Sequence, residues 1–173
     1  MFKKILCPLD GSAPAKQALA LAIDMAKKHD IPLVLLHALL RVTDFSEFQH
    51  FAKVEGLAER VEPEVKRLQG MEARLEVGSA YDERAVSSRV LVEVGQHILD
   101  YAKFEAEHNG VREVSILLVD GDPADQILRC IDEQDIDCVV MGSRGLSGIK
   151  GFFLGSVSHK VTNRAPCTCI AVK

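Results

Sequence analysis

The chain has 173 residues, of which 47% are hydrophobic and only 5% aromatic, and it contains no Trp. That length supports one domain with a full hydrophobic core and is too short for two ordinary domains. The apolar residues are mainly Val, Leu, Ile and Ala, a composition typical of helices packed on a buried sheet and therefore of an α/β protein. The net charge of −4 gives the chain as a whole no attraction for nucleic acid or anionic lipid, so we expect neither as a partner.

No segment of the sequence is expected to enter or cross a membrane. The first apolar run, Ile5 to Leu9, ends at Asp10 and is far shorter than the core of a signal peptide. The longest other apolar stretch, Pro32 to Leu40, contains His37 and is too short to span a bilayer. We therefore expect a cytoplasmic protein that does not bind membranes.

The cysteines do not have the paired spacing of a zinc site, and their number is odd. Most of them lie in apolar runs that are typical of strands. They are Cys7, Cys130, Cys138, Cys167 and Cys169. We expect buried, reduced thiols, without disulfides and without a bound metal.

The first forty residues have the pattern of a strand, a helix and a second strand. The run from Phe2 to Leu9 predicts a short buried strand that ends in a turn over Asp10 to Ser12, a cluster that also serves as a helix cap. From Ala15 to His29 the apolar residues recur every three or four positions, which predicts a helix lying on a sheet. Ile31 to Leu40 is a continuous apolar run, as in a strand covered on both faces.

The segment after Leu40 has the least regular pattern of the chain. Thr43 to Gln69 is mixed and charged, with short helix-like stretches, and Val77 to Ala85 has no clear periodicity. We expect a partly helical insertion at about 41–87, within one domain that spans residues 1–173. From Ser88 the helical pattern returns and predicts a helix that ends near Gly110. Its apolar face is expected to contain Val90, Leu91, Val94, Ile98, Tyr101, Ala102 and Phe104.

The last sixty or so residues alternate between strands and helices. A helix is predicted to begin with Asp122 as its cap and Pro123 at its first position, and a shorter helix covers Ser156 to Asn163. The strands of this region are predicted at Val114 to Val119, Ile136 to Met141 and Cys167 to Val172.

Strand and helix patterns thus alternate along the whole chain. This order is typical of a single-domain α/β protein with an open, mostly parallel five-stranded sheet, right-handed crossovers and helices on both faces. Ligands of such sheets bind at the carboxyl ends of the strands, next to the point where the strand order reverses. Asp10 and Gly142 both lie at predicted strand ends of this kind.

A glycine-rich loop follows the fourth predicted strand. Five of the twelve glycines of the chain fall between Gly142 and Gly155, and glycine permits positive φ and close approach of backbone N–H groups to phosphate oxygens. The loop leads into Ser156, which we expect to cap a helix whose first N–H groups and dipole attract an anion. Arg144 and Lys150 add positive charge, so the loop predicts a phosphate site. The alternative is that the glycines only shape a long surface loop.

The charges near this loop favour the same interpretation. From Cys138 to Lys173 there is no Asp or Glu, while five basic residues give the segment +5 and leave −9 for the rest of the chain. A merely solvated basic face would have the same charge. Asp10, at the facing strand end, is a candidate to accept hydrogen bonds from a ribose; its alternative role is to cap the helix that follows it.

The loop lacks the residues of the common nucleotide-hydrolysing motifs. No G-x-x-x-x-G-K-[ST] sequence occurs, because Lys150 is followed by Gly151, and no G-x-G-x-x-G follows the first strand. The histidines are not grouped with a Ser or Cys in a recognisable catalytic triad, and His37 is expected to be a core residue. The sequence therefore predicts no catalytic residue.

These features resemble the universal stress protein family. The pattern Gly142-x2-Gly145-x9-Gly155-Ser156 is similar to the ATP-binding signature of that family. The resemblance also covers the first strand from Lys4 to Ser12, the segments Gly121–Ala124, Gly155–Ser158 and Ala165–Cys167, and leaves out about Arg41 to Ser87. The last strand departs from the family pattern, because it has Thr168 and Cys169 where a Pro-Val pair is usual.

The resemblance implies an adenine nucleotide alpha hydrolase-like fold with strand order 3-2-1-4-5, a homodimer formed through the last strand at residues 167–172, and binding of ATP with or without magnesium. It places Pro8 and Asp10 beside adenine and ribose, with Ala38 lining the adenine pocket. The residues implied for ribose and phosphates are Met141, Gly142, Ser143, Arg144, Gly145, Leu146, Ser147, Gly155, Ser156 and Val157. The insertion would then form a lid over the nucleotide or a surface for a partner.

Three functions are consistent with this sequence. The leading prediction is an ATP-binding universal stress protein that acts as a nucleotide-dependent regulatory module, because no general base or activated nucleophile accompanies the phosphate loop. The second is an enzyme that hydrolyses ATP slowly or transfers phosphate. The third is an adaptor that binds a partner and for which the nucleotide is incidental.

Overall fold

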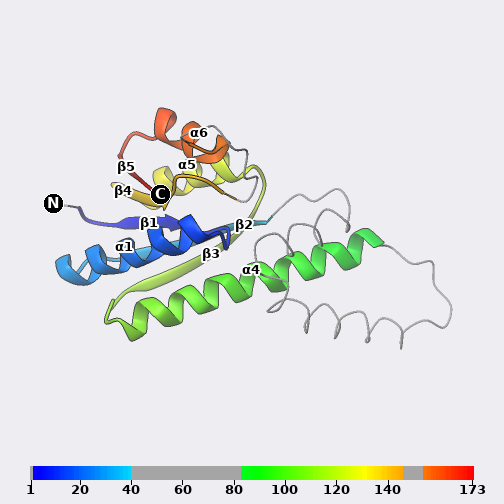
Figure 1. Ribbon diagram of the computed structural model, residues 1–173, viewed down its shortest axis with the longest axis horizontal. Helices are drawn as coiled ribbons and strands as arrows, with labels where there is room; N and C mark the ends of the chain where they lie inside the picture. The colour runs from blue at the N-terminus through cyan, green and yellow to red at the C-terminus, as the bar shows by residue number, and fades with distance from the viewer. Residues whose placement is uncertain (1, 40–82, 146–153) are drawn as a thin grey trace.

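The computed structural model describes residues 2–39, 83–145 and 154–173, which form a sheet flanked by helices (Figure 1). The strands are β1 (Ile5–Pro8), β2 (Leu33–Leu39), β3 (Val114–Asp120), β4 (Cys138–Gly142) and β5 (Thr168–Val172). The helices are α1 (Ala13–His29), α4 (Glu83–His108), α5 (Pro123–Glu133) and α6 (Ser156–Arg164). Most of the insertion predicted at 41–87 lies outside the described residues.

The five strands are parallel and lie in the order β3-β2-β1-β4-β5. The chain builds the sheet from β1 through β2 to β3, and then returns to the other side of β1 to add β4 and β5. This reversal puts the switch point between β1 and β4, where ligands of such sheets bind. The predicted fold class and strand order are confirmed.

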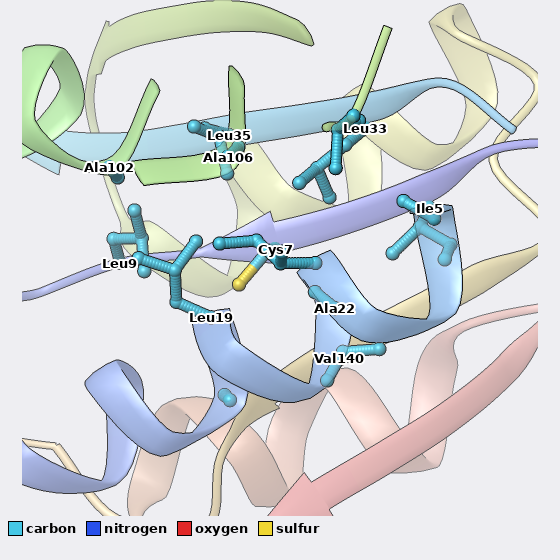
Figure 2. Packing of buried hydrophobic residues seen from close by; sticks show 14 of the residues in the cluster. Ile5, Cys7, Leu9, Leu19, Ala22, Leu33, Leu35, Ala102, Ala106 and Val140 are labelled. Carbon is cyan, nitrogen blue, oxygen red and sulfur yellow. The ribbon is translucent and has the colours of Figure 1, made fainter. Parts of the chain in front are cut away.

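Alternate residues of the central strands belong to two separate cores. α1 and α4 cover one face, where the fully buried strand residues include Ile5, Cys7, Leu33, Leu35 and Val140 (Figure 2). α5 and α6 cover the other face, where Leu6, Val34, Leu36, Val139 and Met141 are buried. Because both faces are covered, the strands have continuous apolar sequences and not alternating ones.

Local signals in the sequence explain the ends of the helices. Ser12 caps α1, and its Oγ accepts a hydrogen bond from the Ala15 backbone N–H at 3.3 Å. Asp122 caps α5 as predicted, through the Asp125 backbone N–H at 3.0 Å. Gly110, with φ of 95°, follows the end of α4, where the sequence predicted a glycine stop.

The structure corrects the prediction for α4. The helix begins at Glu83, earlier than Ser88. Tyr101 and Phe104, which were expected on its buried face, are 47% and 61% exposed. From residue 91 of the helix onward, where burial is described, the buried residues are Gly95, Leu99, Ala102 and Ala106. The small residues of this set let the helix lie close to the sheet, so the aromatic residues point outwards despite their apolar character.

The five cysteines are free thiols. Burial raises the pKa of both Cys130 and Cys138 to about 11, so these thiols stay protonated at neutral pH. In the part of the chain that the structure describes, no group of three or more His, Cys, Asp or Glu is placed to hold a metal ion. None of the described helices has the length and apolar character needed to cross a membrane.

Candidate functional site

A cavity of about 330 Å³ lies at the carboxyl ends of β1, β2 and β4. Residues of α5 and α6 complete its wall, so it lies on the face of the sheet that these two helices cover. The volume is that of a pocket for a small molecule. Its position beside the switch point is the one that the parallel sheet predicts for a ligand.

One wall of the cavity is apolar. It consists of Leu36 and Ala38 from β2, Met141 from β4, Ile127 from α5 and Val157 from α6. Leu36 and Ala38 are two positions apart and therefore share one face of β2. Because Ala38 is small, this wall leaves room for a planar ring, and its apolar surface would disfavour a charged group.

Asp10 supplies a carboxylate at the polar end of the cavity. It lies in the turn after β1, where Gly11 has φ of 87° and the Ser12 backbone N–H donates to Asp10 Oδ1 at 3.0 Å. Ser12 caps α1, so the alternative role considered for Asp10 belongs to Ser12. The second oxygen, Asp10 Oδ2, faces the segment after β4, because a Cβ added to Gly145 would lie 2.7 Å from it.

Ser143 holds the segment after β4 in place. Its backbone N–H donates to Val172 O in β5 at 2.6 Å, and its carbonyl accepts from the Gly155 N–H at 2.7 Å. The hydroxyl of Ser158 donates to Ser143 O at 3.0 Å and to Gly142 O at 3.1 Å. Ser143 and Ser158 are both buried, so these bonds join the end of β4 to the start of α6 away from solvent.

The first turn of α6 lines the cavity through Ser156, Val157 and Ser158. The helix begins at Ser156 with Gly155 as its cap, whereas the sequence predicted Ser156 as the cap. The first bond within the helix runs from the His159 N–H to Gly155 O at 2.9 Å. The N–H groups of the preceding three residues have no partner within the helix, and such groups attract anions.

Three glycines shape the polar end of the cavity. A Cβ on Gly142 would lie 2.9 Å from the Ala15 backbone nitrogen, so only glycine lets the end of β4 pass the start of α1 so closely. A Cβ on Gly145 would meet the Asp10 carboxylate. A Cβ on Gly155 would make ordinary contacts, with its nearest neighbours at 3.4 Å, and would take up space beside Ser158. At Gly142 and Gly145 the polar end of the cavity therefore has no room for a side chain.

The basic residues near the cavity have different roles. Arg144 lines the cavity and its side chain is exposed. Lys160 Nζ lies 3.2 Å from Asp122 Oδ1, and the Arg164 guanidinium lies 3.0 Å from Asp125 Oδ1. The Asp125 backbone N–H, together with Lys160, holds the pKa of Asp122 below its ordinary value.

These ion pairs correct the interpretation of the acid-free segment. Lys160 and Arg164 bind α6 to two acids that are remote in sequence, Asp122 at the cap of α5 and Asp125 in its first turn, so the segment is not a uniform anion site. Lys150 lies outside the described residues. Within residues 2–39, 83–145 and 154–173, the positive groups that remain at the cavity are the Arg144 side chain and the start of α6.

The structure brings most of the residues predicted for nucleotide binding together. Those that line the cavity are Pro8, Asp10, Ala38, Met141, Gly142, Arg144, Gly145, Gly155, Ser156 and Val157. Ser143 does not line it, because its side chain is buried behind the β4 end. Leu146 and Ser147 lie outside the described residues.

Sequence reasoning missed several residues of the wall. They are Leu9, Ala15, Leu36, His37, Pro123 and Ile127. The period of two along β2 points to Leu36 once Ala38 is chosen, and Ile127 lies one helical turn after Pro123. The remaining residues carry no local signal, because they reach the cavity only through the packing of the end of β1, of β2 and of α1.

Comparisons with known proteins agree with this architecture. Residues 1–173 match the sequence profile described as the Universal stress protein family. The chain is 30% identical over 177 aligned residues to the universal stress protein YxiE of Bacillus subtilis, and the alignment covers 100% of both proteins.

Two solved structures share the fold. One is the universal stress protein from Archaeoglobus fulgidus in complex with dAMP, with a TM-score of 0.59, 18% identity, and coverage of 100% of this chain and 98% of that one. The other is a universal stress protein family protein from Arabidopsis thaliana with AMP bound, with a TM-score of 0.62, 17% identity, and coverage of 99% and 91%.

Proposed function

Because the chain belongs to the universal stress protein family, we propose that its cavity binds an adenine nucleotide, ATP in particular, and that the protein acts as a nucleotide-dependent regulatory module. The observation that carries this proposal is the cavity itself. It joins an apolar wall, a single carboxylate and a glycine-rich helix start within one pocket. The dAMP and AMP bound by the two structures of the same fold support an adenine nucleotide as the ligand.

The apolar wall suits the adenine ring. In the proposed pose, adenine lies against Ala38 and Met141, with Pro8 at its edge, where burial of the ring gains hydrophobic free energy. Ala38 occupies a position where a larger side chain would fill the pocket. Among the described residues, no charged side chain lines this part of the cavity, so it would select for the base and not for the phosphates.

Asp10 and the glycine segment suit the ribose and the phosphates. The Asp10 carboxylate accepts hydrogen bonds from ribose hydroxyls, since a carboxylate is an acceptor only. The phosphate groups lie against Gly145 and Gly155, where backbone N–H groups approach without a side chain between, and at the start of α6. Arg144 adds a charge-assisted contact to a phosphate oxygen.

The described wall favours binding over turnover. His37 is 4% exposed and its ring lies against Gly95 of α4, on the face of β2 opposite Leu36 and Ala38, so it is not placed to act as a base on a bound nucleotide. Asp10 already accepts a hydrogen bond from the Ser12 N–H at one oxygen.

We also expect the protein to be cytoplasmic and to form a homodimer through β5, whose described pairing is with β4 on one edge.

The proposal is tested by ligand release and calorimetry. Protein purified from cells is denatured and its supernatant is chromatographed for adenine nucleotides, and ATP, ADP, AMP and GTP are titrated into nucleotide-free protein. We expect ATP to bind and GTP to bind more weakly. Asp10→Asn is expected to lower ATP affinity, whereas the matched control Asp24→Asn, at an exposed position of α1, leaves it unchanged. Absence of any adenine nucleotide binding at millimolar concentration would refute the proposal.

A further inference from the structure

His37 lies at the cavity wall, but its buried, titratable ring is on the opposite face of β2 and does not point toward the proposed nucleotide. Its neighbours on β2, Leu36 and Ala38, belong to the apolar core that continues into the cavity wall. Because successive side chains of a strand point to opposite faces, the His37 ring points to the other face, toward α4. It is 4% exposed there.

The ring holds the backbone at the end of β1. His37 Nδ1 lies 2.7 Å from the Leu9 carbonyl oxygen. A carbonyl only accepts, so Nδ1 carries the hydrogen and donates it. The Leu9 N–H donates to Leu36 O at 2.8 Å, and the parallel register ends at Pro8. Both backbone groups of Leu9 are therefore bonded to β2, one of them through a side chain.

Gly95 of α4 makes room for this ring. A Cβ at that position would lie 2.7 Å from His37 Cδ2 and 2.7 Å from Leu118 Cδ1. Residues of β2, β3 and α4 thus enclose the ring. A ring enclosed in this way has little room to change its rotamer, and in the rotamer that it adopts Nδ1 faces the Leu9 carbonyl oxygen.

Leu9 is followed directly by Asp10, so the bond to Leu9 sets the direction in which the chain leaves β1. We propose that His37 is a positioning residue of the nucleotide site, which places the Asp10 carboxylate through the Leu9 carbonyl. This inference rests on the proposed adenine nucleotide site, and it assigns a role to a residue on the far face of β2. It explains why a strand that is otherwise apolar carries a histidine at this position.

The first experiment compares substitutions of His37. His37→Leu removes the donor, and we expect ATP affinity to fall about tenfold, the effect of losing one buried hydrogen bond. His37→Asn keeps a donor near the position of Nδ1 and is expected to recover most of the loss. His108→Leu, at the exposed end of α4, is the matched control and leaves affinity unchanged. Urea unfolding confirms that each variant is folded.

A double-mutant cycle separates positioning from general destabilisation. If His37 acts through Asp10, His37→Leu has little further effect on ATP affinity in an Asp10→Asn background. An equal loss in both backgrounds would overturn the inference, as would failure of His37→Asn to recover affinity.

A third readout does not need the nucleotide. The carbon NMR signal of the Asp10 carboxyl group should shift in His37→Leu and not in His108→Leu. An unchanged Asp10 signal refutes the positioning role even if ATP binds. A shifted signal together with no ATP binding refutes the proposed function alone.

Discussion

Substitution of Gly142 is expected to lower the free energy of unfolding. Gly142 is the last residue of β4, and a Cβ there would lie 2.9 Å from the Ala15 nitrogen, 3.0 Å from the Pro14 carbonyl carbon and 3.1 Å from the Arg144 oxygen. All three neighbours are backbone atoms. They cannot rotate away as a side chain can, so Gly142→Ala must separate β4 from the start of α1.

The expected cost follows from this overlap. Inserting a methyl group into a packed interior costs about 1–3 kcal/mol when the surroundings must shift. With an m-value of about 2 kcal/mol/M, the midpoint of urea unfolding would fall by roughly 0.5–1.5 M. The matched control is Gly155→Ala, for which the nearest atoms lie at 3.4 Å, so only the poorer capping by Ala lowers the unfolding free energy, by less than about 1 kcal/mol.

The assay is equilibrium unfolding in urea, followed by circular dichroism and fitted for both the midpoint and the m-value. An unchanged m-value shows that stability, and not the compactness of the unfolded chain, has changed. If Gly142→Ala is as stable as Gly155→Ala, then β4 does not pass α1 at the distance described, and the account of the polar end of the cavity is wrong.

Three further predictions concern Asp10 and His37. Gly145→Ala places a methyl group 2.7 Å from Asp10 Oδ2, so calorimetry should show ATP binding weakened about tenfold with little change in the urea midpoint; a lower midpoint with normal binding would contradict this. Gly95→Ala gains about 1 kcal/mol of helix propensity, yet its overlap with His37 and Leu118 should lower the midpoint, and a raised midpoint would contradict the packing. Burial lowers the pKa of His37 from its ordinary value of 6.5, so below pH 6.5 the unfolded chain binds a proton that the folded chain does not. The unfolding free energy should therefore decrease as the pH is lowered below 6.5, by at most about 1.4 kcal/mol per pH unit from this group. His37→Asn should remove that contribution.

The strands and most of the helices could be predicted because their signals are local. The continuous apolar run around Leu33–Leu39 requires cover on both faces, and Asp122 followed by Pro123 marks the start of a helix whatever surrounds it. The orientation of α4 could not be predicted in the same way. Whether the helix turns Phe104 or Gly95 toward the sheet depends on the space beside His37 and Leu118, and this space is set by β2 and β3.

The same distinction applies to the candidate site. Gly142, Gly145 and Gly155 can be recognised in the sequence, because their spacing forms a glycine motif. The hydrogen bonds and ion pairs around them leave no such pattern in the sequence. Ser143 joins β4 to α6 through its backbone, and Lys160 is neutralised by an acid on a different helix. Such pairings depend on tertiary contacts, so counting charges along the chain overestimated the positive potential at the cavity.

The importance of His37 follows from what lies behind the turn that carries Asp10. A second cavity, of about 350 Å³, lies between α1 and α4, and Leu9 and Ala15 line both cavities. In the part of the chain that the structure describes, a cavity therefore lies on each side of the turn, although Leu9 and Ala15 themselves are buried in the core. Two directional bonds also position the turn, namely Ser12 N–H to Asp10 and His37 to Leu9. Beside a cavity the backbone has room to shift when one such bond is lost, and for this reason a change at His37 should reach a carboxylate that it does not touch.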